Sequence, residues 1–260
     1  MKIHPIIGHI QTLYLVEYAD KLMLLDGGCR ADVTTVITFI EQTLQRSIGD
    51  LKVVVVTHMH PDHAGAAHLL RKRTQCKIVT GAQTTHWYQG WQGVLMFWSD
   101  LALAHWMAKR LGKSKARLWY PRKLYADLQL ADQQRIPLFE EWQVLNTPGH
   151  TDRDLSLYHA EQGILYVADL MVEVKNHLIA PFPVFYPKLY RRSVERVYQL
   201  NPQQLLLAHG GEVNLDYEIY QHILKTAPRS PVTHWRVVSI KMKKLVRGLV
   251  QRFIRFSFFL

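Results

Sequence analysis

Cysteine is scarce in this chain, and long apolar runs are absent from it. The 260 residues include two cysteines, Cys29 and Cys76, which are too few for a disulfide scaffold and form no Cys-x-x-Cys pair. We therefore expect both to be small packing residues in a reducing compartment. No stretch reaches about 18 consecutive apolar residues, so the sequence predicts no membrane-spanning helix. The N-terminus shows no apolar core with a cleavage site, so we expect a cytoplasmic protein.

Acidic residues are missing from two stretches that are rich in basic residues. Residues 101–126 carry seven Lys or Arg, and residues 227–260 carry eight, without any Asp or Glu in either stretch. The whole chain has 32 Lys and Arg against 21 Asp and Glu, a formal net charge of +11. This excess favours an anionic partner, which could be a substrate, a membrane surface or nucleic acid.

Short β-rich runs alternate with helical patterns along most of the chain. A hydrophobic content of 48% and a charged content of 20% are typical of a globular protein with a sizeable core. The predicted strands are Leu13–Glu17, Leu22–Leu25, Lys52–Val56, Lys77–Val79, Leu124–Leu130, Trp142–Asn146, Leu155–Tyr158, Ile164–Val167 and Gln204–Leu207. The predicted helices are Val33–Arg46, one from about Ala64, Lys188–Gln199 and Leu215–Lys225. This alternation predicts a layered α/β domain over residues 1–226, followed by a tail at 227–260.

A dense cluster of metal-binding residue types follows the predicted strand that contains four valines. Within the sequence THMHPDH lie His58, His60, Asp62 and His63. Imidazole and carboxylate groups suit zinc, iron and similar ions. In an extended turn His58 and His60 can face one ion, while Asp62 and His63, at the start of the next helix, can face another. The alternative is a polar loop or helix cap whose histidines are incidental.

Three further candidates occur at the ends of later apolar runs, namely His150, Asp169 and His209. Taken singly, each fits a loop histidine or a helix cap as well as it fits a ligand. Their order along the chain after the THMHPDH cluster indicates that the three residues belong to one site together with that cluster.

In this order of residues the chain resembles the metallo-β-lactamase superfamily from Ile10 to about Val213. The Asp26-Gly27-Gly28 turn matches the family's first motif, residues 57–63 match its metal-binding signature, and the three later candidates match its remaining ligands. The resemblance implies a four-layer αββα fold, in which two mixed sheets lie between helices. It also implies one or two metal ions at the ends of the strands.

Carrying the family's roles over assigns the ligands to two ions. The first ion would be held by His58, His60 and His150, and the second by Asp62, His63 and His209. Asp169 would bridge the two ions. Asp26 matches the family's buried acid, which supports the ligand loop and does not bind metal.

The resemblance further implies a dinuclear metal-dependent hydrolase. Two adjacent cations can share a water and lower its pKa from about 16 towards 7, which gives a bridging hydroxide as the nucleophile. We expect zinc, with iron or manganese as alternatives, and attack on an ester, thioester or lactone of a small hydrophobic substrate. The catalytic candidates are Asp62, which could carry a proton to the leaving group, and the bridging Asp169.

Five of the seven tryptophans lie between residues 85 and 120. We interpret this segment as a helical insertion that covers the metal cleft and holds a lipophilic acyl group. The candidate pocket residues are Trp87, Trp91, Trp98 and Trp106. The alternatives are ordinary helix core and packing against a second subunit, which would make a homodimer.

Residues 237–260 place apolar side chains near helical spacing, with basic residues between them. This pattern predicts a basic amphipathic C-terminal helix. Such a helix could dock on the domain, lie in the interface of an anionic membrane, or contact nucleic acid. In the second case the cytoplasmic protein would be peripheral to the membrane.

Other functions share the same ligand set. The basic stretches favour a phosphodiesterase or nuclease that uses the same dinuclear site. A persulfide dioxygenase-like enzyme with one iron, and a non-enzymatic role for the metals, are further alternatives. N-acyl homoserine lactonases resemble this chain in size and ligands, but they place a tyrosine three residues after the bridging aspartate, where this chain has Val172.

Overall fold

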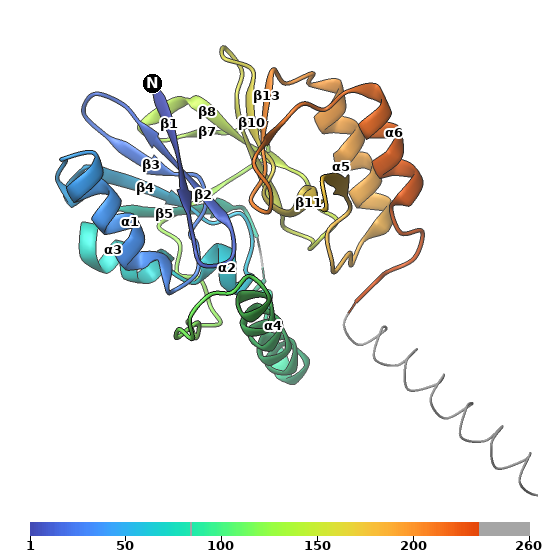
Figure 1. Ribbon diagram of the computed structural model, residues 1–260, viewed down its shortest axis with the longest axis horizontal. Coiled ribbons are helices and arrows are strands. Elements are labelled where there is room, and N and C mark those ends of the chain that lie inside the picture. The colour runs from blue at the N-terminus through green and yellow to red at the C-terminus, as the bar shows by residue number, and fades with distance from the viewer. Residues whose placement is uncertain (84, 234–260) are drawn as a thin grey trace, which may run out of the picture.

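The computed structural model describes residues 1–83 and 85–233 (Figure 1). The first group of strands is β1 (Lys2–Ile7), β2 (Thr12–Glu17), β3 (Leu22–Leu24), β4 (Leu51–Val55), β5 (Lys77–Gly81) and β6 (Leu128–Leu130). The later strands are β7 (Arg135–Ile136), β8 (Phe139–Asn146), β9 (Leu155–His159), β10 (Ile164–Tyr166), β11 (Val172–Val174), β12 (His177–Ile179), β13 (Gln204–Leu206) and β14 (Glu212–Val213). The helices are α1 (Asp32–Thr38), α2 (Pro61–Ala64), α3 (Ala67–Thr74), α4 (Gly90–Arg110), α5 (Pro187–Gln199) and α6 (Tyr217–Thr226). The predicted helix at 237–260 lies outside the described residues.

Two six-stranded sheets are built from successive halves of the chain. The first has the order β1-β2-β3-β4-β5-β6, and its strands from β3 to β6 are parallel. The second has the order β14-β13-β10-β9-β8-β7, with β10 and β13 parallel and its other pairs antiparallel. A separate hairpin of β11 and β12 follows β10.

The sheets face each other, and alternation along the strands fills the space between them and behind them. In β4, Val53 and Val55 join the cluster between the two sheets, whereas Val54 joins the cluster on the helix side of the first sheet. A strand that is buried on both faces needs apolar residues at successive positions, which explains the run of valines. Both cysteines are buried and unpaired, as the sequence predicts.

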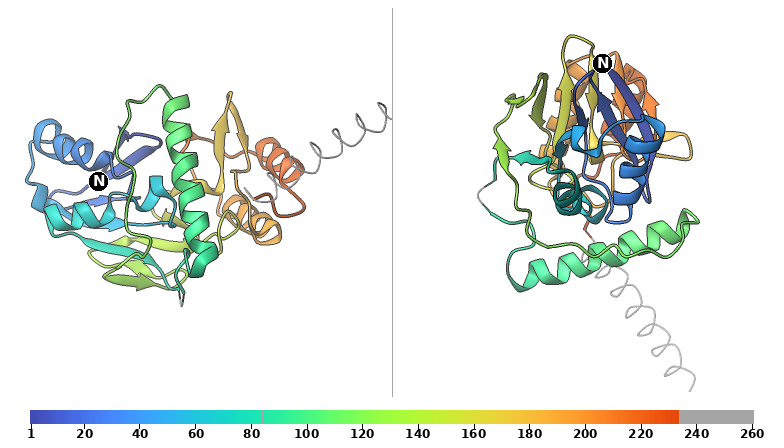
Figure 2. Two further views of the ribbon diagram at one scale, coloured as in Figure 1. Left: turned by 90° about the horizontal axis from the view of Figure 1, so that it is seen from below. Right: turned by 90° about the vertical axis from the view of Figure 1, so that its left-hand side faces the viewer.

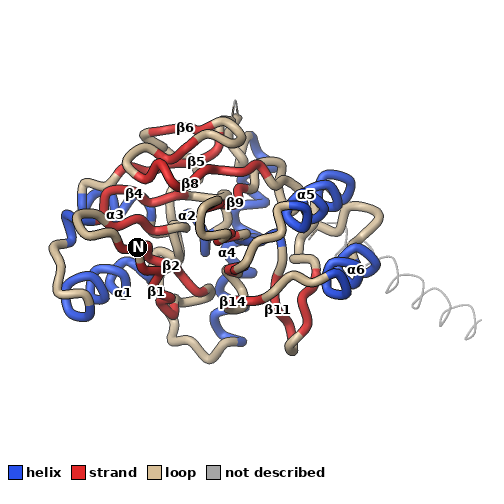
Figure 3. The backbone as a smooth tube through the Cα atoms, turned by 90° about the horizontal axis from the view of Figure 1, so that it is seen from above, coloured by secondary structure: helices blue, strands red, loops and turns tan. Residues whose placement is uncertain are grey.

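Helices cover the outer face of each sheet (Figure 3). Side chains of α1, α3 and α4 pack on the first sheet, and those of α5 and α6 on the second. Local sequence explains where two of these helices begin. Pro187 occupies the first turn of α5, and the Asp216 carboxylate accepts a hydrogen bond from the Ile219 N–H at 2.7 Å to cap α6. The arrangement confirms the predicted four-layer αββα fold.

Some predicted boundaries were wrong. The strand expected over 124–130 begins only at Leu128, because the Asp127 carboxylate accepts the Ile78 N–H that a longer strand would use. The helix expected over 33–46 is α1 followed by a π-helical turn, Phe39–Thr43. The β11–β12 hairpin was not predicted. Its two turn residues, Lys175 and Asn176, both have the positive φ that a type I′ hairpin turn requires.

The tryptophan-rich segment forms α4, a helix of 21 residues that lies at the surface and crosses one side of the molecule (Figure 2). Phe97, Leu101, Ala104 and Ala108 pack its inner face into the core behind the first sheet. In the described part of the chain, no helix has both the length and the apolar character needed to cross a membrane.

Candidate metal centre

Residues from the first sheet enter the site in the turn between β4 and α2. His58 and His60 follow the end of β4, and Asp62 and His63 lie in α2, which begins at Pro61. All three histidines are buried. A proline at the start of the helix fixes its φ and therefore the direction in which the next two side chains leave the backbone.

Residues from the second sheet reach the same place from three strand ends. His150 follows β8, Asp169 lies in the 3-10 turn Ala168–Leu170 after β10, and His209 follows β13. Because these three strands run in the same direction, their carboxyl ends meet at one edge of the sheet. The structure therefore brings all seven predicted ligands together, in two groups.

The first group consists of His58, His60, His150 and Asp169. His60 Nδ1 lies 3.1 Å from His58 Nε2 and 2.8 Å from His150 Nε2. Asp169 Oδ2 lies 3.3 Å from His150 Nε2 and 4.0 Å from His58 Nε2. Three ring nitrogens and one carboxylate oxygen thus converge on a single point.

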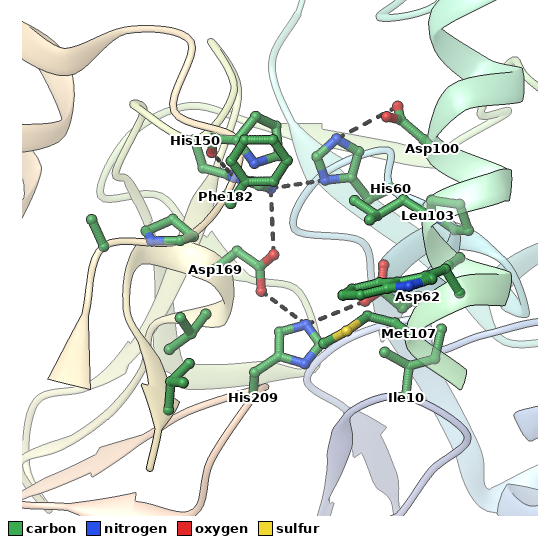
Figure 4. A pocket seen from close by; sticks show the side chains of 18 of the residues that line it. Ile10, His60, Asp62, Asp100, Leu103, Met107, His150, Asp169, Phe182 and His209 are labelled. Atoms are coloured by element: carbon green, nitrogen blue, oxygen red, sulfur yellow. Dashed lines mark hydrogen bonds and ion pairs between the residues drawn. The ribbon is translucent and has the colours of Figure 1, made fainter. Parts of the chain in front are cut away.

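The second group consists of Asp62, His63 and His209. His209 Nε2 lies 3.2 Å from Asp62 Oδ2. The other oxygen of Asp169, Oδ1, lies 3.2 Å from His63 Nε2 and 3.4 Å from His209 Nε2. Asp169 therefore presents one carboxylate oxygen to each group (Figure 4).

The donor atoms of these groups fit metal ions better than they fit one another. His63 Nε2 and Asp169 Oδ1 are buried and face each other, yet neither has a hydrogen bond of acceptable geometry within the described residues. Buried polar atoms without partners are rare in folded proteins, and a metal ion is one way to satisfy them. The mixture of imidazole and carboxylate donors suits zinc and iron.

Burial and the close packing of imidazoles and carboxylates shift the pKa values of the donor groups in both directions. Burial and the neighbouring imidazoles lower the pKa of His58 and His60 well below its usual range, which keeps both rings neutral and able to bind metal. Burial alone would raise the pKa of Asp62, but His63 and His209 outweigh it and lower the value to about 2. Burial would likewise lower the pKa of His63, but Asp169, Asp26 and Asp62 hold it well above its usual range.

Asp26 is buried next to the turn that carries the ligand candidates, and it is not a member of either donor group. Its Oδ2 accepts hydrogen bonds from the Thr57 hydroxyl at 2.7 Å and the Tyr166 hydroxyl at 3.0 Å, and lies 2.5 Å from His63 Nδ1. Gly27 is needed beside it, because a Cβ there would lie 2.4 Å from the His63 carbonyl oxygen. Asp26 thus belongs to neither donor group and contacts one of their members, His63, through Nδ1.

The sequence did not reveal the groups that orient His150. Its Nδ1 lies 2.6 Å from the Pro183 carbonyl oxygen, which can accept the Nδ1 proton and leave Nε2 free to face the first group. The buried Asp154 carboxylate accepts hydrogen bonds from the Thr151 N–H at 2.7 Å and the Gly149 N–H at 3.1 Å. The spacing Thr-x-x-Asp in the sequence could have predicted this turn, because an Asp side chain commonly accepts hydrogen bonds from nearby backbone N–H groups.

Asp100, on the buried face of α4, was also missed. Its Oδ2 lies 3.7 Å from His60 Nε2 and accepts a hydrogen bond from the Tyr88 hydroxyl at 2.9 Å. Burial raises the pKa of Asp100 to about 7. A single acid between Phe97 and Leu101, on the apolar side of a helix, was the signal in the sequence.

A cavity of about 280 Å³ opens beside the two groups. His60, Asp62, His150, Asp169 and His209 form its floor. Most of the remaining wall is apolar. Ile10 comes from the loop between β1 and β2, and the other apolar residues come from α4, the hairpin and the segment that follows it: Leu103, Ala104, Trp106, Met107, Val172, Val174, Ile179, Ala180, Pro181, Phe182 and Pro183.

The structure changes the expected wall of tryptophans. Of the four candidates, Trp106 lines the cavity, whereas Trp91 and Trp98 are 71% and 57% exposed on the outer side of α4. Trp87 packs against Phe185, with ring centroids 5.2 Å apart, and lines two other hollows. Trp91 and Trp98 lie on the outer side of α4 and Trp87 lies before that helix begins, so none of the three lines the cavity. The unpredicted β11–β12 hairpin supplies part of the wall instead.

Comparisons with known proteins agree with this geometry. A profile of the metallo-beta-lactamase superfamily matches residues 7–245. The chain is 22% identical over 228 residues to the probable metallo-hydrolase YflN of Bacillus subtilis (strain 168), an alignment that covers 80% of this chain and 83% of that protein.

Solved structures show the same fold. The metallo-beta-lactamase family protein TTHA1429 of Thermus thermophilus aligns with a TM-score of 0.64 and 22% identity, covering 86% of this chain and 77% of that one. TTHA1623, solved in a di-iron-bound form, aligns with a TM-score of 0.56 and 21% identity, covering 86% of this chain and 98% of that one.

Proposed function

Because this chain belongs to the metallo-beta-lactamase superfamily, we propose that it is a dinuclear metal-dependent hydrolase of an ester, thioester or lactone that carries a hydrophobic group. The observation that carries this proposal is the position of Asp169. Its two carboxylate oxygens face the two donor groups separately, at 3.3 Å from His150 Nε2 and 3.4 Å from His209 Nε2. A carboxylate with one oxygen toward each group can bridge two metal ions.

The proposed ligands of the first ion are His58, His60 and His150, those of the second are Asp62, His63 and His209, and Asp169 serves both. Zinc suits the donor set, and iron and manganese are alternatives. The di-iron form of TTHA1623 supports the view that this fold accommodates a pair of metal ions. When bound, two divalent ions would supply an acidified water and Lewis-acid stabilisation of a carbonyl oxygen.

The chain's own residues would position the reacting groups and exclude water. Pro183 holds the His150 ring, and Asp26 holds the His63 ring, so that the Nε2 atoms of both face the centre. Asp62 lines the cavity, and it is the group that we propose moves a proton toward the leaving group. Leu103, Met107 and Phe182 keep water from the apolar part of the substrate.

The lining of the cavity favours a carbonyl substrate over a phosphodiester. Among the described residues that line it there is neither Lys nor Arg, whereas phosphate recognition commonly uses both. The apolar wall suits an acyl or alkyl group, and about 280 Å³ lies near the lower end of ligand pockets. A small molecule, or one arm of a larger molecule, fits this space.

The test combines metal content with turnover. Full-length protein purified without chelator should contain two metal ions per chain, and it should hydrolyse acyl esters, thioesters or lactones. His60→Ala should abolish turnover, with the retained circular dichroism spectrum as the control for folding. Hydrolysis that survives both this substitution and removal of the metals would contradict the proposal, and turnover of phosphodiesters alone would favour the phosphodiesterase alternative.

A further inference from the structure

The outer face of α4 carries a stripe of exposed apolar side chains. Trp91, Leu95, Trp98 and Trp106 are 71%, 44%, 57% and 51% exposed. Residues at this spacing lie along one side of a helix, and 21 residues extend about 32 Å. Three tryptophans and a leucine exposed on one side of a helix are unusual for a monomeric soluble protein, in which large exposed apolar patches often mark interaction sites.

The opposite side of α4 already holds the helix in place. Phe97, Leu101, Ala104 and Ala108 are buried in the core behind the first sheet. Trp91 and Trp98 lie on the side of the helix away from this buried face, and Figure 2 shows α4 crossing the surface of the molecule. The stripe is available for an external partner.

Basic residues surround the C-terminal end of the stripe. Lys109 and Arg110 are exposed in the last turn of α4, and the Arg110 guanidinium lies 5.4 Å from the centre of the Trp106 ring. The loop that follows adds exposed Lys115 and Arg117. Residues 101–126 contain no acid that would offset these charges.

We propose that this face of α4 docks on the interface of an anionic lipid bilayer. Tryptophan concentrates at the boundary between headgroups and acyl chains, and basic side chains beside it are attracted to anionic lipids. A second copy of the chain is the other occupant of this face that the experiment below distinguishes, through the oligomeric state of the variants.

The cavity adjoins the docking surface. Leu103, Trp106 and Met107 line the cavity from the same helix that carries the stripe. A hydrophobic substrate dissolved in the bilayer would therefore meet the cavity without crossing bulk water. This last step rests on the proposed hydrolase function, whereas the docking itself does not.

The experiment measures binding of the full chain to vesicles by co-sedimentation. Vesicles of phosphatidylcholine with phosphatidylglycerol are compared with vesicles of phosphatidylcholine alone. A double variant with Trp91→Ser and Trp98→Ser should lower the partition coefficient for the anionic vesicles on the order of tenfold, because it removes two large apolar groups from the interface. The matched control Tyr217→Ser removes an exposed aromatic residue from α6 and should change binding less than about twofold.

A second variant, with Lys109→Glu and Arg110→Glu, tests the electrostatic part and should weaken binding to the anionic vesicles only. Sedimentation of the tryptophan variant at the wild-type level would overturn the proposal and transfer any lipid binding to residues 237–260. A change from dimer to monomer in that variant without lipid would instead identify a second copy as the partner. Because binding needs no turnover, these outcomes are distinct from failure of the hydrolase proposal.

Discussion

His63 Nδ1 lies 2.5 Å from Asp26 Oδ2, and this contact links the second donor group to the segment that follows β3 of the first sheet. The Asp26 carboxylate also accepts the N–H of Gly27 at 3.0 Å and that of Thr57 at 3.2 Å, so the turn that carries the ligands and the side chain that orients one of them share a single anchor. The anchor fixes which nitrogen of His63 faces the centre.

Asp26→Asn should therefore weaken binding at the second group. An amide in place of the carboxylate cannot accept all of these hydrogen bonds, and loss of such an orienting group typically costs about 10–100-fold in metal affinity. Competition with a chelator, followed by elemental analysis, measures the change. Tyr166→Phe is the control, because it removes another hydrogen bond to Asp26 and leaves His63 in place. An equal loss in both variants would mean that the effect is general destabilisation.

Removing Asp169 should affect metal content differently from removing His209. Asp169→Ala deletes the carboxylate that faces both groups, so affinity should fall for both metals, whereas His209→Ala deletes a donor of the second group and should leave about one metal per chain. Elemental analysis at equal free metal concentration distinguishes the two variants. Retention of two tightly bound ions by Asp169→Ala would contradict the bridging role.

Ala180→Leu should change the preference for acyl chain length. Ala180 lines the cavity, so a larger side chain removes space that a long acyl group would occupy. We expect kcat/KM to fall about tenfold for long-chain esters and less than about threefold for acetyl esters, a range typical of a change of a few methylene groups in a hydrophobic pocket. Ala102→Leu is the matched control, because Ala102 is exposed on the outside of α4 and lies outside the cavity. Equal losses for both chain lengths would place the acyl group elsewhere.

Asp132→Asn should reduce stability at neutral pH and have less effect in acid. Asp132 Oδ1 accepts hydrogen bonds from the Asn146 N–H at 2.7 Å and from Arg196 at 2.9 Å. Burial raises the pKa of Asp132, but Arg196 and the Asn146 N–H together lower it further than burial raises it. The folded state therefore binds this proton less tightly than the unfolded state does, so the stabilisation is present above pH of about 4 and disappears as the pH falls.

Urea denaturation should give a difference in the free energy of unfolding of about 0.5–1 kcal/mol at pH 7, since the pair is partly exposed. That difference should shrink as the pH is lowered toward about 3. A difference that is the same at both pH values would show that the charge of Asp132 contributes nothing.

Much of the fold and of the candidate site could be predicted, because the decisive signals are local. The run of valines in β4 reports burial on both faces, and the THMHPDH turn places four donors within six residues. His150, Asp169 and His209 each follow a predicted strand, and the family resemblance identified them as ligand candidates. In the structure these three strands run in the same direction, so the three residues meet at one edge of the sheet.

The walls of the cavity could not be predicted in the same way. Helical spacing shows that α4 has an apolar side and a tryptophan side, but it does not say which side packs on the protein. The core behind the first sheet holds Phe97 and Leu101, and this packing turns Trp91 and Trp98 outward. Pro183 and Asp100 act through contacts that span tens of residues in sequence, and such contacts leave no periodic signal.

The division of the donors between the two sheets has a consequence for how the protein matures. His58, His60, Asp62 and His63 belong to the half of the chain that is synthesised first, and the other three donors belong to the half that follows. Neither half alone carries all the members of either donor group. A metal ion that needs donors from both halves would therefore bind fully only after the second half has been synthesised and has docked on the first. Binding would then stabilise the docked arrangement of the two halves.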